Sequence, residues 1–336
     1  MTPAGSPPPV AVVAVDGGNS KTDIVLAALD GTVLARHRGP GSSPHALGLE
    51  RSVSLLSDLI GHALTELGNG RSRPLALSVC LAGLDLPEEE DEARAALASA
   101  AIGQRLTVHN DTFAVLRAGL ANGNAGVAVV CGAGINAVGR GPDGVARFLA
   151  IGAMSGDWGG GLELGLHALG SAVRYEDGRG PFTRLGPAVA AWFDLPDAHA
   201  VAIAMHRHRI DRSRLVELAP LVVGLARQHD PVAALLVERC AQEVTAFASA
   251  AAGRIGVSAE PFHVILGGSM LTGADPLIGE LATALIIERN PLAQVELVSV
   301  APVVGAALLG FDELGVSAAA EPTLRKSLPL ETVHPN

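Results

Sequence analysis

Aromatic residues, cysteines and positive charge are all scarce in this chain. Aromatic residues make up 3% of its 336 residues, and the three cysteines are Cys80, Cys131 and Cys240. Because these cysteines are odd in number, far apart and in no CxxC pair, neither a disulfide scaffold nor a zinc or redox centre is expected. The formal net charge is -10. That charge argues against nucleic acid or an anionic membrane as a partner, because both attract positive surfaces.

Long apolar segments are also missing. No uncharged apolar run approaches the roughly 18 residues of a membrane-spanning helix without glycine-rich turns in it. The stretch 1–9 is proline-rich and lacks the basic and apolar regions of a signal peptide. Hydrophobic residues nevertheless make up 49% of the chain, which excludes a disordered protein. We expect a cytoplasmic enzyme with two domains of ordinary size.

The first third of the chain has the pattern β-β-β-α-β-α-β. Short apolar runs separated by turn residues predict three strands that form an antiparallel meander, followed by alternating helices and strands. The expected strands are 10–15, 22–29, 32–37, 75–81 and 106–109, with helices over 50–67 and from 87 onward.

The same pattern then begins again, with helical insertions. The expected strands are 127–130, 135–139, 145–151, 262–266 and 295–300, and the expected helices are 163–175, 216–228 and 231–254. This is a repeat of pattern and not of residue identity.

Glycine-containing turns occupy matching places in the two copies, between the first and second strands of each meander. The first contains Gly17 and Gly18, and the second contains Gly132 and Gly134. A turn without Cβ atoms lets backbone N–H groups approach an anion, so the pair could hold the phosphates of one nucleotide. Taken singly, each turn is more readily explained as a plain hairpin; the recurrence at matching places favours the ligand.

Five short motifs in order resemble one known family, over roughly residues 10 to 315. They are Asp16-Gly17-Gly18-Asn19-Ser20-Lys21-Thr22, Asn110-Asp111, Gly132-Ala133-Gly134-Ile135-Asn136, Gly156-Asp157-Trp158-Gly159 and Gly267-Gly268-Ser269. This set resembles the N-acetylglucosamine kinase and BadF/BadG-type ATPase family of the sugar kinase and actin-like ATPase superfamily. Within it the chain is most similar to actinobacterial glucosamine kinases, and the run Asp177-Gly178-Arg179-Gly180-Pro181 looks like the bacterial branch.

The resemblance implies an α/β protein with two RNase H-like lobes and a nucleotide and sugar cleft between them. The expected domains are 1–115, with a flexible tail over about 1–9, and 116–320 with helical insertions, followed by a tail over 321–336. A return of the last helix to the first lobe is an alternative. ATP would be the co-substrate, Mg²⁺ the metal and an amino sugar the second substrate. A homodimer is also implied.

The same resemblance places ATP on three loops. The implied residues are Gly17, Gly18, Asn19, Ser20, Lys21 and Thr22 in the first, Gly132, Ala133, Gly134 and Asn136 in the second, and Gly267, Gly268 and Ser269 in the third, which would hold adenosine. Relatives usually have Thr at the place of Ala133, so phosphate contact there would depend on backbone amides or Asn136. Lys21 could pair with phosphate or could be a solvated hairpin lysine.

Two aspartates match the catalytic positions of the family. Asp111 matches the base that accepts the proton of the sugar hydroxyl; the alternative is a helix N-cap, a place that Asn110 could also fill. Asp16 would hold Mg²⁺ directly or through water; the alternative is a residue that only shapes the turn.

Sugar binding is implied for residues at four places in the chain. The residues are Ser42, Ser43, His45, Asn110, Asp111, Asp157 and Glu176. Pro44 stands where N-acetylglucosamine kinases typically have Asn, and Glu176 is an added acid that could pair with a 2-ammonium group, in its own subunit or across a dimer. Asp157 could instead be an N-cap, and Trp158 a wall of the site or a core residue.

These expectations favour phosphorylation of glucosamine at the 6-hydroxyl. N-acetylglucosamine kinase is the first alternative. An ATPase that activates acyl-CoA reductases or dehydratases is less favoured, because the cysteines give no ligand set for an iron–sulfur cluster. A sugar-responsive repressor of the ROK type would need a DNA-binding extension, and only about nine residues precede the first strand.

Overall fold

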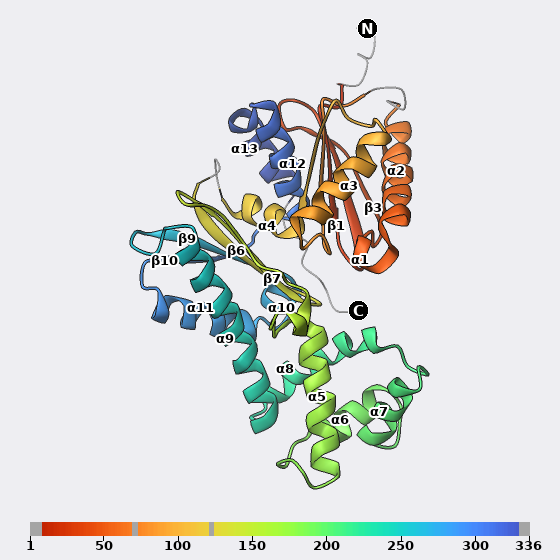
Figure 1. The fold of residues 1–336 in the computed structure, drawn as a ribbon, viewed down its shortest axis with the longest axis vertical. Helices are drawn as coiled ribbons and strands as arrows, with labels where there is room; N and C mark the ends of the chain where they lie inside the picture. The colour runs from red at the N-terminus through yellow and green to blue at the C-terminus, as the bar shows by residue number, and fades with distance from the viewer. Residues whose placement is uncertain (1–8, 69–72, 121–123, 329–336) are drawn as a thin grey trace, which may run out of the picture. The chain divides into compact units, whose positions relative to one another are not determined.

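The computed structural model describes residues 9–68, 73–120 and 124–328. The chain divides into two compact units, Met1–Ala125 with Val298–Thr332 and Gly126–Leu297 with Val333–Asn336. Each unit contains one five-stranded sheet (Figure 1). The domain limits expected above stay a prediction.

The first sheet has the strand order β3-β2-β1-β4-β5. Its strands are β1 (Val12–Gly17), β2 (Lys21–Ala27), β3 (Val33–Pro40), β4 (Ala76–Leu81) and β5 (Arg105–Asn110). The first three form the expected antiparallel meander, and β1, β4 and β5 run parallel to one another. The carboxyl ends of these three parallel strands therefore meet at one edge of the sheet.

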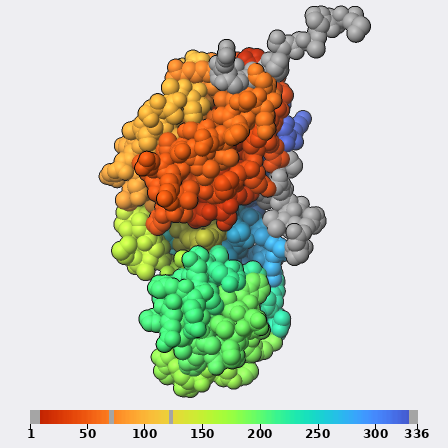
Figure 2. All heavy atoms as spheres, turned by 90° about the vertical axis from the view of Figure 1, so that its right-hand side faces the viewer, coloured from red at the N-terminus to blue at the C-terminus, as the bar shows by residue number. Residues whose placement is uncertain are grey.

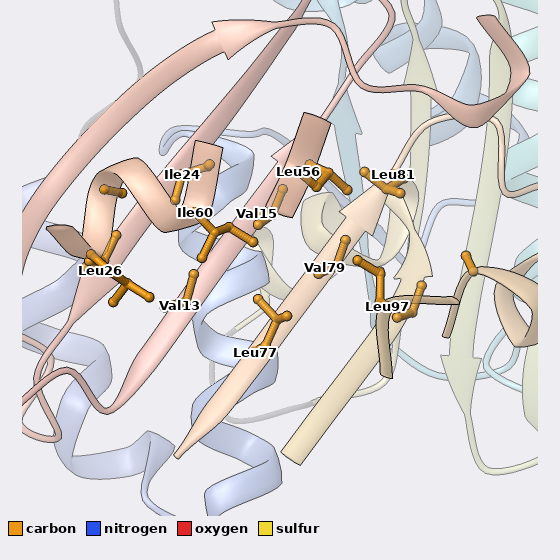
Figure 3. Packing of buried hydrophobic residues seen from close by; sticks show 14 of the residues in the cluster. Val13, Val15, Ile24, Leu26, Leu56, Ile60, Leu77, Val79, Leu81 and Leu97 are labelled. Atoms are coloured by element: carbon orange, nitrogen blue, oxygen red, sulfur yellow. The ribbon is translucent and has the colours of Figure 1, made fainter. Parts of the chain in front are cut away.

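Helices cover both faces of this sheet. The helices of the first unit are α1 (Pro44–Leu47), α2 (Leu49–Glu66), α3 (Pro87–Ser99), α4 (Asp111–Gly119), α12 (Pro302–Leu314) and α13 (Ser317–Ser327). On one face, α2 and α3 bury an apolar core in which Leu56, Ile60 and Leu97 pack on strand residues such as Val13 and Val79 (Figure 3). On the other face, α12 packs on β1 and β4 beside α4.

The second sheet repeats the first. Its order is β10-β9-β6-β7-β8, with β6 antiparallel to β7 and parallel to β9. The strands are β6 (Gly126–Cys131), β7 (Ile135–Gly141), β8 (Gly144–Arg147), β9 (Phe262–Gly267) and β10 (Ala293–Leu297). The long helix α9 (Pro231–Arg254) packs across β6, β7 and β8, and α11 (Leu277–Arg289) packs on α9 and β10.

The helices between β8 and α9 form the insertion. They are η2 (Gly152–Met154), α5 (Gly160–Glu176), α6 (Leu185–Trp192), α7 (Ala198–His206), η3 (Arg212–Leu218) and α8 (Ala219–Arg227). The short α10 (Ser269–Thr272) follows β9 and packs on β9 and α11. Helix α5 leads from the strands into α6 and α7 (Figure 1), and the residues from α5 to α8 form one continuous block of surface (green in Figure 2).

The α/β class and the repeated strand order are confirmed, and three local expectations are corrected. Strand β8 ends at Arg147 and not at 151. The helix expected over 216–228 is a 3-10 helix up to Leu218 followed by α8, because Pro220 lies in the first turn of a new helix. Residues 321–327 of the expected tail belong to α13; residues 1–8 and 329–336 lie outside the described residues. Among the described helices, none is long and apolar enough to cross a membrane.

Candidate active site

Two aspartates lie at the carboxyl edge of the first sheet. Asp16 is the next-to-last residue of β1 and pairs in register with Cys80 of β4, which in turn pairs with His109 of β5. Asp111 begins helix α4 directly after β5. Strand direction thus brings together two carboxylates that are far apart in the sequence.

Their surroundings disfavour the ionised form of both side chains. Burial raises the pKa of Asp16 to about 7, helped by the charges of Asp111 and Asp23 and opposed by Lys21. Burial and the Asp85 carboxylate raise the pKa of Asp111 to about 6, although backbone N–H groups of the first helical turn lower it. Like charges in a desolvated site have this effect, and groups with such pKa values are candidates for acid–base or metal chemistry.

Asn110 is the N-cap of α4, and Asp111 is not. The Asn110 Oδ1 accepts hydrogen bonds from the Thr112 backbone N at 3.0 Å and from the Thr112 hydroxyl at 2.6 Å. Its amide donates to the Leu84 carbonyl and to Asp85 Oδ1, each at 3.1 Å. The Asn110 side chain therefore makes its hydrogen bonds within the fold, and its role in sugar binding stays a prediction. The Asp111 carboxylate is not needed as the helix cap.

The carboxylates at this edge suit a hard divalent cation. Oxygen ligands are what Mg²⁺ prefers, and a bound dication would relieve the repulsion that raises the pKa values of Asp16 and Asp111. Asp85, which the sequence analysis missed, adds a third acid in the turn after β4. The sequence could have indicated Asp85, because it closely follows a strand that was expected to be parallel to the strands before Asp16 and Asp111.

The first expected phosphate loop has an open part and a closed part. Gly18 donates its N–H to the Lys21 carbonyl at 2.8 Å and closes the turn, on which Asn19 and Ser20 are exposed. Thr22 is fully buried and donates its hydroxyl to the Pro40 carbonyl at 2.7 Å. Lys21 forms an ion pair with Asp23, with 3.0 Å between Nζ and Oδ2. Gly18, Asn19 and Ser20 are thus accessible, whereas Thr22 supports the loop from inside.

The loop expected to bind sugar packs against this phosphate loop. Ser42 and Ser43 are fully buried and donate their backbone N–H groups to the Gly18 carbonyl at 3.1 and 3.3 Å. The Ser43 hydroxyl has no hydrogen-bond partner among the described residues, whereas Ser42 Oγ lies 2.8 Å from the Thr22 hydroxyl. His45 is exposed on α1. An unpaired buried hydroxyl is costly, so Ser43 fits a ligand role better than Ser42.

The second and third expected ATP loops contact each other. Strands β6 and β9 are parallel neighbours, and Val130 pairs with Gly267. Gly268 has a φ of +90°, and a Cβ on it would collide with the backbone of Cys131. Ala133 and Gly134 are exposed at the loop tip, and Ser269 is exposed at the start of α10. The glycine at 268 therefore allows a close approach that no other residue would permit.

The N-terminus of α5 supports the second phosphate loop. The backbone N–H groups of Gly161 and Leu162 donate to the carbonyls of Gly132 and Ala133 at 2.7 and 3.0 Å. Asn136 Oδ1 accepts from the backbone N of Ala137 at 2.7 Å. The N-terminus of α5 and the second expected phosphate loop are therefore joined by backbone hydrogen bonds.

Asp157 lies just before α5 and is not its N-cap, which is Gly159. Asp157 Oδ2 accepts from the Ser155 hydroxyl and from the Gly152 backbone N, the latter at 3.2 Å. The next residue, Trp158, is buried, and the Arg239 guanidinium of α9 lies 4.2 Å from the centre of its ring. Trp158 is thus a core residue held by a cation–π contact.

A second acid from α9 lies near Asp157. Glu243 follows Arg239 by one helical turn, so the two share a face of α9. Burial raises the pKa of Glu243, Arg239 lowers it, and the Asp157 charge raises it again. Sequence reasoning missed Glu243, because nothing in a helix of this length marks which turn faces the Asp157 loop.

The structure does not bring Glu176 together with Asp157. Glu176 is the last residue of α5, a helix of 17 residues that begins after Asp157, so about 24 Å of helix separates them. Its carboxylate accepts hydrogen bonds from the backbone N of Ala198 at 2.9 Å and of His199 at 3.1 Å, and it lies 2.7 Å from the His199 ring. In its own chain, Glu176 binds the first backbone N–H groups of α7, whose N-cap is Asp197.

The two sheets have the RNase H-like strand order of sugar kinases and actin-like ATPases, and this defines the structural class of the protein. The model of the BadF/BadG/BcrA/BcrD ATPase family matches residues 13–310, and the chain belongs to this family.

Named relatives are sugar kinases. The chain is 23% identical over 311 residues to an N-acetyl-D-glucosamine kinase of Dictyostelium discoideum, covering 89% of this chain and 97% of the relative. It is 26% identical over 235 residues to an N-acetylmuramic acid/N-acetylglucosamine kinase of Clostridium acetobutylicum, covering 69% and 76%. A solved structure from Chromobacterium violaceum, named as a candidate N-acetylglucosamine kinase, has a TM-score of 0.71 and 26% identity over 90% of this chain and 99% of that one.

Proposed function

We propose that this protein is an ATP-dependent kinase that phosphorylates an amino sugar at its 6-hydroxyl, with Mg²⁺ as the metal. The observation that carries the proposal is Asp111, a partly buried carboxylate that is not needed as the cap of α4 and whose pKa of about 6 leaves it ionised at neutral pH. Phosphoryl transfer to a hydroxyl needs such a proton acceptor beside a metal-binding carboxylate. Asp16 is the candidate for the latter.

ATP as the co-substrate is supported by the family and by the glycine loops. Gly18, Asn19 and Ser20 in one unit and Ala133, Gly134 and Ser269 in the other are accessible, and we propose that they contact the nucleotide. A cytoplasmic location and a homodimer stay predictions.

For the sugar we propose glucosamine, with N-acetylglucosamine as the second candidate. The names of the relatives favour N-acetylglucosamine. Two features of this chain favour a cation at C2: Pro44 offers no side-chain donor for an acetamido group, and Asp157 has a second acid, Glu243, close enough for their charges to interact. We therefore propose Glu243, in place of Glu176, as the partner of the ammonium group beside Asp157.

The experiment is a comparison of kcat/KM for glucosamine, N-acetylglucosamine and glucose. It uses the unaltered protein, Glu243→Gln, and Glu176→Gln as the matched control. We expect the unaltered protein to prefer glucosamine by roughly 10²-fold, because an unpaired desolvated carboxylate penalises the neutral sugars. Glu243→Gln should reduce the preference over glucose by about tenfold, and Glu176→Gln should leave it unchanged.

Each part of the proposal can fail separately. Faster turnover of N-acetylglucosamine by the unaltered protein would replace glucosamine by the second candidate. If Glu176→Gln abolishes the preference for glucosamine and Glu243→Gln retains it, the partner of the ammonium group is Glu176, acting from another subunit. If none of the three sugars stimulates ADP release, the kinase assignment itself is wrong.

A further inference from the structure

A cavity of about 400 Å³ lies within the helical insertion of the second unit. Its walls come from the middle of α5, from α7 and from η3. Leu169, Met205 and Leu215 are among the apolar lining residues, and the charged or titratable lining residues are Arg174, Arg179, His206 and Arg212. None of the described lining residues is acidic.

Positive charge gathers at this cavity although the chain as a whole is acidic. The whole sequence has a formal net charge of -10, yet three arginines line one small cavity. Arg179 is neutralised by Asp177, with 2.6 Å between its guanidinium and Oδ2. Arg174 donates to the Arg179 carbonyl at 2.9 Å and makes no ion pair with a described residue. The Arg212 guanidinium makes no ion pair or hydrogen bond with a described residue.

The size and the lining together indicate a small ligand. Ligand cavities typically have volumes of about 300 to 1,000 Å³, mostly apolar walls and a few polar groups that fix orientation. Guanidinium groups bind phosphate in a bidentate manner, and a phosphate monoester carries a charge of about -1.5 to -2 at neutral pH. The two arginines without an ion pair to a described residue match that charge, and the leucine and methionine side chains match an apolar body.

We propose that this cavity binds a small phosphate monoester attached to an apolar group. The proposal does not depend on the function proposed above. The site is separate from the ATP loops of the same unit, because Gly161 and Leu162 hold the phosphate loop while the cavity begins at Leu166 and extends along α5 to Arg174.

The test is a calorimetric titration of the full chain with phenyl phosphate. A saturating concentration of ADP is present, so that the nucleotide loops are occupied. Inorganic phosphate supplies the charge without the apolar body, and benzyl alcohol supplies the apolar body without the charge. We expect phenyl phosphate to bind at one site, with an affinity at least about tenfold above that of either comparison compound.

Two variants locate the binding. Arg212→Ala removes an exposed cation from the lining and should lower the affinity for phenyl phosphate by about tenfold. Arg207→Ala removes the same charge from an exposed position that does not line the cavity, and its effect should be less than about twofold. Equal losses in the two variants would indicate a general charge effect and overturn the proposal.

Other results would also overturn it. One is the absence of saturable binding. Another is binding that appears only without ADP, because that would assign the phosphate to the nucleotide loops. A third combines two observations: Arg212→Ala changes the oligomeric mass, and the unaltered protein does not bind phenyl phosphate. That result would assign the cavity to a contact between protein molecules.

Discussion

At the scale of single residues, the candidate chemistry depends on which carboxylates the fold leaves free. Asp111 is not needed as the cap of α4, because Asn110 fills that place, and Asp16 lies at the end of β1 beside Cys80 and Asp23. The position of both acids could be predicted from the sequence, since an acid at the end of an apolar strand lies at the carboxyl edge of a parallel sheet; their roles stay predictions.

The roles of their neighbours could not be predicted in the same way. Thr22, Asn110 and Glu176 were expected at the ligand but make hydrogen bonds to residues 18 to 26 positions away, namely Pro40, Leu84 and Ala198. Such partners are fixed by tertiary packing. Sequence spacing alone does not show whether a polar side chain faces a ligand or the protein.

Replacing Asp111 with Asn should remove the proton acceptor. We expect turnover to fall by about 10²-fold or more, while the affinity for ATP changes little. The variant should keep its fold, because the cap of α4 is Asn110. Steady-state kinetics measure turnover, titration with ATP in the absence of sugar measures nucleotide affinity, and circular dichroism checks the fold. Turnover within a few-fold of the unaltered protein would remove Asp111 from the reaction.

Gly17 and Gly18 should respond differently to substitution. A Cβ on Gly17 would collide with Ser42 and Leu81, whereas one on Gly18 would lie 3.4 Å from the Lys21 carbonyl. We expect Gly17→Ala to lower the free energy of unfolding by about 1–3 kcal/mol. Gly18→Val should fold normally but raise the KM for ATP by about tenfold, because a side chain blocks close approach of the phosphates. Urea unfolding and ATP titration of each variant distinguish the loss of stability from the loss of binding.

At the scale of elements, apolar runs and turn residues predicted nearly all strands. The periodic pattern of Pro231–Arg254 also predicted α9 with its observed bounds. The expectation failed where a local breaker interrupts an apolar stretch. Pro220 separates η3 from α8, and β8 stops before Ala150, which has a φ of +50°. A left-handed residue of this kind depends on its surroundings and leaves no clear mark in the sequence.

The start of α5 tests how far one helix controls a ligand loop. Gly160 has a φ of +81°, and a Cβ on it would lie 2.5 Å from Gly134 Cα and 2.6 Å from the Ala133 carbonyl oxygen. Gly178, after the same helix, has a φ of +80°, and a Cβ on it would have no described neighbour within 4 Å. Gly178→Ala should therefore lower the free energy of unfolding only through backbone strain, by about 1 kcal/mol.

Gly160→Ala should cost the same strain and also displace the second phosphate loop. We expect a larger loss of stability than in Gly178→Ala, together with a rise of about tenfold in the KM for ATP. Urea midpoints and ATP titrations of the two variants provide the comparison. If both variants bind ATP equally well, α5 does not hold this loop in a binding conformation.

At the scale of the whole molecule, the second unit is inserted into the first along the chain. The first unit needs residues from both sides of the insertion, 1–125 and 298–332. Helix α12 is buried along most of its length against β1 and β4, and Gly305 lets it approach the backbone of α4. The repeat of pattern was readable from the sequence, but the exact limits of each unit depend on these distant contacts.

A buried ionic network joins α4, α12 and α13 within the first unit. Arg117 of α4 is 3% exposed and contacts Asp312 at 2.7 Å and Glu321 at 2.9 Å. Arg325 contacts Glu321 at 2.6 Å. Burial raises the pKa of Glu321, but hydrogen bonds and charges from Arg117 and Arg325 outweigh it and hold the pKa below its ordinary value.

This network should make the stability of the protein depend on pH at the acid end. A carboxyl group whose folded pKa is depressed stabilises the fold above its unfolded pKa, which is about 4.3 for Glu. That contribution decreases below this value and is lost as the pH falls through the lower folded pKa. At pH 7, Glu321→Gln should therefore lower the free energy of unfolding by about 1–3 kcal/mol. The difference from the unaltered protein should shrink as the pH falls below about 4.

The measurement is the urea midpoint of both proteins from pH 7 to the acid limit of folding. Glu92→Gln, an exposed position on α3, is the matched control and should differ little from the unaltered protein at any pH, because an exposed acid contributes little. A deficit in Glu321→Gln that stays constant with pH would mean that Glu321 stabilises α13 by packing alone. In that case, the charge on Glu321 does not hold α12 and α13 to the rest of the first unit.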